Sequence, residues 1–416
     1  MESLYTCCAG LDVHKQTVVA CLLRPAEGSE SEAKEIRTFG TTTTALVELR
    51  DWLRAAGCTH VAMEATGSFW KPVHNILDGH CTLLVVNAAH MRALPGRKTD
   101  VRDAEWIATL LKHGLLRASF IPTREQRELR DLTRTRTSLI DERSAAVNRI
   151  QKVLEDANIK VAGVATDIMG KSGRDILAAL LEGEMDAAAM ANLARGKLRR
   201  KRDALEQALE GRMGAHHRML IALHLEHVDL LDEQIARISA EIAERLRPYE
   251  AALVRLESIP GVGRRTAEIL AAEMGLDMER FPTAGHLASW AGLCPGVHES
   301  AGKRKAGKRR AGNKALRRAL TEAAHAAART KKKDHTYLRG QYRRLVVRCG
   351  KQKAAVAVGH TILRIAHHVL AHETTYQERE LVQLDDHRRA RMQQRALAQL
   401  KALGYDVALT PKQPAA

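Results

Sequence analysis

Four acidic residues in the first quarter of the chain have the types and spacing of a metal site. They are Asp12, Glu64, Asp100 and Asp103. Asp12 lies inside the apolar stretch GLDV, where a buried carboxylate needs a cation or a hydrogen-bond network to offset its desolvation. Asp100 and Asp103 are three residues apart, so on a helix they share one face. Carboxylate oxygens suit Mg²⁺ or Mn²⁺, and such ions can clamp a phosphodiester and stabilise its transition state.

Each of these acids also has a structural explanation when it is taken alone. Asp100 follows Thr99 and can cap a helix, and Asp103 favours the dipole of the same helix. Asp12 is harder to explain in this way, because strand interiors disfavour Asp. The combination of the four acids therefore favours a metal site.

A serine in a basic, glycine-rich segment is the second candidate for chemistry. Ser300 lies in GLCPGVHESAGKRKAGKRRAGNK, which we expect to be a loop. A serine hydroxyl is a weak nucleophile, but nearby cations can orient a phosphate and neutralise developing charge. The candidate cations are Lys303, Arg304, Lys305, Lys308, Arg309 and Arg310. Judged from the residues alone, a serine with no role beyond the loop is the commoner case.

The distribution of charge indicates a nucleic-acid partner. The chain has 416 residues and a net charge of +17, and residues 301–350 hold 17 Lys or Arg against two acids. Nearly the whole surplus therefore lies in one segment, whereas an ordinary solvated face mixes charges of both signs. The sequence predicts that this segment binds a polyanion.

The stretch IPGVGRRTAEIL is typical of a helix-hairpin-helix, a motif that contacts DNA without reading its sequence. Gly261 and Gly263 would let backbone N–H groups approach a phosphate, and Arg264 and Arg265 would add positive charge. A glycine-rich connection between two helices is the alternative.

The elements that must position the four acids alternate between strands and helices over residues 1–120. The predicted strands are 6–13, 16–23, 35–40, 59–65 and 81–88, and the predicted helices are 41–57, 67–79 and 100–116. This order is that of an RNase H-like α/β domain with a mixed sheet. There the first strand lies beside the fourth and the last helix crosses them, so the four carboxylates would converge.

The rest of the chain is predicted to be helical. Residues 121–250 form an arm, in which Leu231, Ile235, Ile238 and Ile242 mark an interhelical seam. Both a self-packed hairpin and a coiled coil between two copies fit this seam, and we favour an arm that also mediates self-association. Residues 251–375 are expected to form a small all-helical domain, and residues 376–416 a charged helical tail with a disordered end.

Other sequence features exclude several classes of protein. The seven cysteines are scattered without a CxxC pair, which argues against a disulfide framework or a zinc site. No apolar run reaches about 18 residues, and the N-terminus is not of the signal-peptide type. We expect a cytoplasmic, nucleoid-associated protein.

Several long blocks of the chain resemble one known family, in the right order from end to end. These blocks are GLDVHK, MEATGSFW, VVNAAHMRALPGRKTDVRDAEWIA, SIPGVGRRTAEIL and FPTAGHLASWAGLCPGVHESAGKRKAGKRRAGNKALRRAL. The family is the DEDD-type transposases of bacterial insertion sequences, which are bridge-RNA-guided serine recombinases. The resemblance implies a Holliday-junction-resolvase-like N-terminal domain and a C-terminal transposase domain.

The resemblance also implies roles for particular residues. Asp12, Glu64, Asp100 and Asp103 would be the four acids that bind Mg²⁺, and Ser300 would attack DNA to form a covalent intermediate. The family commonly has Ser-Gly at the nucleophile, whereas this chain reads Ser300-Ala301-Gly302. A structured guide RNA would pair with donor and target double-stranded DNA, and the protein would act as a dimer or tetramer. The low aromatic content, 3%, fits a protein that leaves base reading to an RNA.

Two other functions remain open on the sequence. One is a metal-dependent junction endonuclease in which the serine forms no covalent bond. The other is a non-catalytic nucleic-acid-binding protein, although an acidic cluster would repel phosphate unless a metal intervened.

Overall fold

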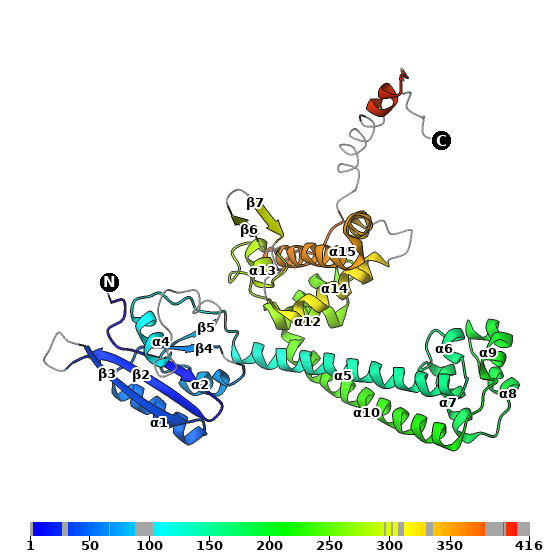
Figure 1. Ribbon diagram of the computed structural model, residues 1–416, viewed down its shortest axis with the longest axis horizontal. Coiled ribbons are helices and arrows are strands. Elements are labelled where there is room, and N and C mark those ends of the chain that lie inside the picture. The colour runs from blue at the N-terminus through cyan, green and yellow to red at the C-terminus, as the bar shows by residue number, and fades with distance from the viewer. Residues whose placement is uncertain are drawn as a thin grey trace. The chain divides into compact units, whose positions relative to one another are not determined.

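The computed structural model describes residues 3–26, 32–65, 67–87, 103–294, 297–300, 303–306, 312–329, 336–378, 394 and 397–405. The chain divides into two compact units, residues 1–122 and 123–416. Each unit is described by itself (Figure 1).

The first unit is built on a five-stranded mixed sheet. Its strands are β1 (Cys8–Val13), β2 (Thr17–Pro25), β3 (Glu32–Gly40), β4 (His60–Glu64) and β5 (Thr82–Val86). They lie in the order β3-β2-β1-β4-β5. β1 is antiparallel to β2 and parallel to β4, and β4 is parallel to β5. The mixed sheet is confirmed, and its order is compatible with the predicted RNase H-like fold.

Helices cover both faces of this sheet (Figure 1). Alternate residues of β1, Ala9, Leu11 and Val13, pack in one core with buried residues of α1 (Thr43–Ala55) and α2 (Trp70–Leu77). Cys8 and Cys21 point to the other face, where they pack with α4 (Asp103–Lys112). Since side chains alternate along a strand, Gly10 and Asp12 lie on the α4 face with Cys8.

Gly10 sets how closely α4 approaches the sheet. A Cβ atom added at this position would lie 2.2 Å from the carbonyl oxygen of Ala104 and 2.3 Å from the amide nitrogen of Ala108. No side chain fits at those distances, so the glycine allows the helix backbone to rest directly on β1.

The second unit contains a long helical arm. Its two long helices, α5 (Arg124–Asp156) and α10 (Ala215–Leu246), pack side by side (Figure 1). Three cross-pairs show that they run in opposite directions, namely Glu128–Arg245, Arg143–Asp232 and Asp156–His217. Leu231, Ile235 and Ile242 of the predicted seam are buried, and Ile238 is partly buried. The self-packed hairpin therefore occupies this seam.

Between the two long helices the chain forms a cluster of short ones at the far end of the arm. They are α6 (Val161–Val164), α7 (Lys171–Glu182), α8 (Ala187–Asn192), η1 (Leu198–Lys201) and α9 (Arg202–Leu209). Their buried aliphatic side chains share one core with Ile150 and Leu154 of α5 and Ile221 and Val228 of α10. After α10, the short turn η2 (Arg247–Tyr249) leads into the C-terminal domain.

The C-terminal domain is mostly helical. Its helices are α11 (Glu250–Glu257), α12 (Arg264–Met274), α13 (Ala284–Trp290), α14 (Lys314–Ala328) and α15 (Tyr337–Ala371). The expectation of an all-helical domain was wrong, because β6 (Val297–Ser300) and β7 (Lys303–Ala306) form a two-stranded sheet. Ser300 pairs with Lys303, so only Ala301 and Gly302 stand between the paired strands, a spacing typical of a tight hairpin. The density of charge in this stretch concealed the strand pattern.

Within the described residues, α15 is the one helix long and apolar enough to cross a membrane by length and composition. Half of its apolar window is buried, and its buried side chains Val358, Ile362, Ala366 and Val369 belong to the core of the C-terminal domain. Gly350, at a φ of 80°, interrupts the helix. These features are those of a core helix in a folded domain.

The contact at Gly10 gives a direct test of the first unit. Replacing Gly10 with Ala should lower the free energy of unfolding by about 1–3 kcal/mol, because α4 must move away from β1. Gly40→Ala is the matched control, since its Cβ would meet only the Cβ of Ala45 at 3.4 Å. Urea denaturation measures both. Equal stability of the two variants would show that α4 does not rest on β1 in this way.

Candidate active site

Asp12 and Glu64 lie next to one another at the ends of two neighbouring strands. In the parallel pairing of β1 with β4, Leu11 is opposite Met63, so the next position along each strand is Asp12 and Glu64. Ala62 packs on the α4 face, and Glu64, two residues further along the strand, lies on the same face. Adjacent strands are about 4.8 Å apart, which places the two carboxylates within reach of a shared cation.

The direction of α4 brings Asp103 to the same place. The contacts between β1 and α4 show that the strand and the helix run in opposite directions. The thiol of Cys8 donates to the carbonyl oxygen of Ala108 at 3.8 Å, whereas Gly10, later in the strand, lies against Ala104, earlier in the helix. The helix therefore begins at the Asp12 end of the strand, and Asp103 is its first residue. Three of the four predicted acids share one end of one sheet face. Asp100 lies outside the described residues.

The surroundings of these acids are only partly closed to solvent. The side chain of Asp12 is 21% exposed, and its Oδ2 lies 3.1 Å from Nε2 of His14. In the first turn of α4, Glu105 accepts a hydrogen bond from Lys34 of β3 at 2.8 Å. His14, two residues after Asp12 and just beyond the end of β1, was not among the predicted site residues. Carboxylates gathered in this way repel one another unless a cation lies between them.

Ser300 is placed at the end of β6, opposite Lys303 in β7. Lys303, Arg304 and Lys305 belong to β7, whereas Lys308, Arg309 and Arg310 lie outside the described residues. The base of this segment is tightly closed, since a Cβ at Gly312 would lie 2.4 Å from the carbonyl oxygen of Ala291. The two ends of the segment that contains the serine hairpin are thus held together.

The predicted DNA-contacting turn is folded as a connection between α11 and α12. Gly261, at a φ of 90°, packs on α14, and a Cβ there would lie 2.3 Å from the carbonyl oxygen of Ala323. A Cβ at Gly263, the residue that caps α12, would meet no atom within 4 Å. The structure therefore gives Gly261 a role in packing within the protein and leaves Gly263 open.

Arg264 and Arg265, which follow Gly263, differ in whether their charge is balanced within the protein. Arg264 donates to both carboxylate oxygens of Glu250 at 2.6 Å, and also to Glu257 and Glu268. Its hydrogen bonds, those to Glu250 above all, raise the pKa of Arg264. Arg265 is exposed and makes no ion pair within the described part of the chain. The charge of Arg264 is balanced internally, and that of Arg265 is available to a ligand.

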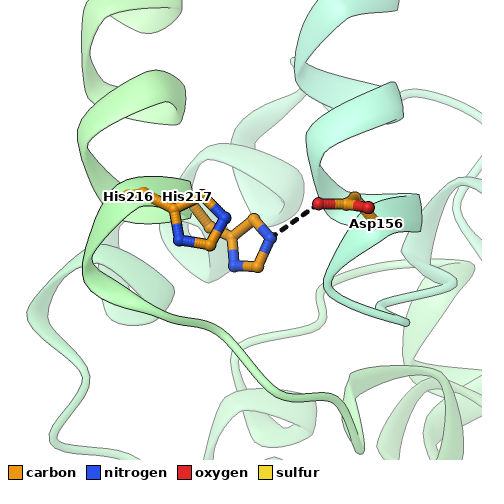
Figure 2. A group of neighbouring side chains, drawn as sticks. All are labelled: Asp156, His216 and His217. Carbon is orange, nitrogen blue, oxygen red and sulfur yellow. Dashed lines mark hydrogen bonds and ion pairs between the residues drawn. The ribbon is translucent and has the colours of Figure 1, made fainter.

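A second group of possible metal ligands lies at the far end of the arm. Figure 2 shows Asp156 at the end of α5 facing His216 and His217 at the start of α10. Nδ1 of His217 accepts a hydrogen bond from the backbone N–H of Gly214 at 3.0 Å, and Nε2 lies 2.9 Å from Asp156. Nδ1 is thus an acceptor, so Nε2 carries the proton and donates it to Asp156. His217 acts as a helix cap that joins the two long helices.

Comparison with known proteins gives two family matches. Residues 9–159 match a model of DEDD transposases of the IS110 type, described as Transposase, and residues 253–339 match one described as Transposase IS116/IS110/IS902 family. Together they cover more than half of the chain. The chain belongs to the IS110/IS116 transposase family. It is therefore an enzyme that acts on DNA, and membership of a DEDD family implies the use of a divalent metal.

Curated relatives from two bacteria agree. A "Probable family 20 transposase" of Pseudomonas aeruginosa is 29% identical over 79% of this chain and 89% of its own length. The "Transposase for insertion sequence element IS1111A" of Coxiella burnetii is 26% identical over 77% of this chain and 79% of its own. The similarity thus extends over both units of this transposase.

The contrast between Arg264 and Arg265 is testable by a pair of adjacent variants. Arg264→Gln should lower the free energy of unfolding by about 1–3 kcal/mol, because it removes a partner from the buried Glu268. Arg265→Gln should change it by less than about 0.5 kcal/mol. Thermal and urea unfolding measure both, and a larger loss for Arg265→Gln would contradict the structural role given to Arg264.

Proposed function

We propose that this transposase cuts and rejoins DNA to move an insertion sequence, using a magnesium-binding acidic site and Ser300 as the nucleophile. The observation that carries the proposal is the placement of Asp12, Glu64 and Asp103 at one end of the α4 face of the sheet. Asp100, three residues before Asp103, would complete the set of acids. The alternative of a non-catalytic binding protein is excluded by the family.

The donor set of the acidic site fits a hard divalent ion. Asp12, Glu64, Asp100 and Asp103 offer only carboxylate oxygens, which favour Mg²⁺ or Mn²⁺ over softer metals. Such an ion would stabilise negative charge on a bound phosphodiester. In this proposal His14 fixes the carboxylate of Asp12 through its hydrogen bond to Oδ2, which leaves Oδ1 for the ion.

The serine step proceeds by substitution at phosphorus. The oxygen of Ser300 bonds to the phosphorus of a DNA strand, its hydroxyl proton is lost, and the bond to one DNA oxygen breaks. That oxygen takes up a proton and leaves as a free DNA hydroxyl. The ester that remains keeps the energy of the broken bond, so the reverse attack by a DNA hydroxyl can rejoin strands without ATP. Lys303, Arg304, Lys305, Lys308, Arg309 and Arg310 would hold the non-bridging oxygens. Gly263 and Arg265 would contact other phosphates of the nucleic-acid backbone.

Sequence choice and assembly belong to the same proposal. A structured RNA from the element would pair with donor and target DNA, so the protein needs few aromatic side chains for reading bases.

The arm would mediate assembly into a dimer or tetramer. Because the predicted seam is used within the hairpin, the exposed Met219, Leu223 and Leu230 on α10 are the candidates for coiled-coil contact between copies. The acids and the serine can then meet within one chain or between chains, in a cytoplasmic, nucleoid-associated complex.

The acidic site is tested by Asp12→Asn, which removes a charge at nearly constant volume. We expect strand cleavage in Mg²⁺ to fall by at least about a thousandfold, because one ligand of the ion is lost. The unfolding midpoint in EDTA should stay unchanged or rise, since repulsion among carboxylates falls. Cleavage at the wild-type rate by the correctly folded variant would overturn the role of Asp12.

The covalent step is tested by Ser300→Ala. The wild-type protein, incubated with labelled DNA, guide RNA and Mg²⁺, should give a protease-sensitive protein–DNA adduct on denaturing electrophoresis. Ser300→Ala should bind both nucleic acids and give no adduct, because it lacks the attacking oxygen. Strand cleavage by the alanine variant without an adduct would support the rival metal-dependent endonuclease. An unchanged adduct would place the nucleophile elsewhere.

A further inference from the structure

A positively charged cleft lies between the arm and the C-terminal domain of the second unit. It has a volume of about 370 Å³ and is formed by one face each of α5, α12 and α14. Five cationic side chains line it, and two carboxylates, Glu273 and Glu322, do so as well. The cations are Arg134, Arg136, Arg265, Lys314 and Arg318. The lining therefore carries more positive than negative charge.

Two of the exposed cations that line the cleft have no carboxylate partner within the described residues. Arg318 is held by Asp141 and Glu322, so its charge is balanced. Arg265 and Lys314 are exposed and form no ion pair within the residues that the structure describes. Lys314 and Ala315 begin α14, so the positive end of that helix dipole also opens on the cleft.

The buried carboxylate at the floor of the cleft is shared between two cations, of which Arg134 lines the cleft and Arg130 lies behind it. Glu273 is fully buried and is shared by two guanidinium groups, those of Arg130 at 3.5 Å and Arg134 at 2.7 Å. Burial, together with repulsion from Arg134, lowers the pKa of Arg130 to about 10 despite the opposing effect of Glu273. One carboxylate is thus shared by two cations, and the side chain of Arg134 is half exposed.

A buried hydrogen-bond donor points to a missing acceptor. Arg136 lines the cleft with a side chain that is 3% exposed, and its Nη1 donates to Glu268 at 2.6 Å. Its Nη2 is buried and makes no hydrogen bond. An unsatisfied donor of a charged group is costly to bury, so an acceptor that reached it would be stabilised strongly.

We propose that this cleft binds a phosphate of a nucleic-acid backbone, an inference that rests on the nucleic-acid partner of the proposed function. Arg265 and Lys314 hold its non-bridging oxygens at the rim, and Arg134 meets it from the floor. The site is separate from the basic hairpin that carries Ser300, but it is joined to that hairpin's base. The amide nitrogen of Asn313, the residue that caps α14, donates to Glu273 at 2.6 Å. A nucleic-acid strand bound in the cleft would therefore have a fixed position relative to both the arm and the base of the serine hairpin.

The test removes the two rim cations and measures binding. Arg265→Gln/Lys314→Gln is compared with Arg199→Gln/Arg200→Gln, which removes the same charge from the exposed turn η1 in the arm. Fluorescence anisotropy follows labelled duplex DNA and a labelled RNA hairpin over a range of salt concentrations. The cleft variant should bind about tenfold more weakly, and the slope of log affinity against log salt should fall by about 0.9 per lost phosphate contact on duplex DNA. The control variant should change neither quantity by as much.

A second variant introduces a carboxylate into the cleft instead of removing its cations. Thr266 lies on the α12 face of the cleft, and Thr266→Glu would place a carboxylate among the cations, where the phosphate is proposed to bind. This variant should unfold at a higher temperature than the wild type while binding nucleic acid at least about tenfold more weakly. A destabilised Thr266→Glu protein that binds nucleic acid normally would contradict the proposal.

The outcomes separate the cleft from the wider proposal. If the wild type binds neither DNA nor RNA, the nucleic-acid partner of the proposed function is wrong. If the wild type binds but the cleft and control variants lose affinity equally, the phosphate site is wrong and the proposed function stands. Loss on the DNA alone, or on the RNA alone, identifies which backbone occupies the cleft.

Discussion

The close contact of α4 with β1 at Gly10 is the constraint on which the acidic site depends. A helix normally stands off a sheet by the length of the intervening side chains. Here the backbone of α4 at Ala104 and Ala108 meets the strand directly, because Gly10 has no side chain. The first turn of the helix is thereby held over the ends of β1 and β4. The register of these two parallel strands completes the site, because it places Asp12 beside Glu64.

A second constraint joins the arm to the C-terminal domain. Two buried carboxylates of α12, Glu268 and Glu273, are paired with arginines of α5. A buried ion pair contributes little net stability compared with an apolar contact, but removing one partner costs about 3–5 kcal/mol. The pairs therefore fix the geometry of α5 against α12 more than they stabilise the unit. This geometry shapes the cationic cleft and anchors the base of the serine hairpin.

The first unit followed closely from its sequence, whereas parts of the second did not. The short apolar strands and the order of strands and helices over residues 1–120 predicted the mixed sheet. The predicted seam of α10 was located correctly, but periodicity alone could not say whether α5 or another chain would cover it.

The β6–β7 hairpin was missed because consecutive charged residues hide the alternation on which strand prediction depends. The packing role of Gly261 was invisible for another reason: its neighbour, Ala323, lies sixty-two residues away along the chain. His14 was overlooked because its contact with Asp12 is a matter of side-chain geometry and not of sequence pattern.

The most direct measurement is a titration of the metal-free protein with Mn²⁺, followed by electron paramagnetic resonance. We expect Asp12→Asn, Glu64→Gln and Asp103→Asn each to weaken Mn²⁺ binding by at least about tenfold, because the three residues hold one site. Asp156→Asn, which alters the group at the far end of the arm, should leave the affinity unchanged. Loss of Mn²⁺ binding in Asp156→Asn, with normal binding in the three other variants, would contradict the assignment of the acidic site.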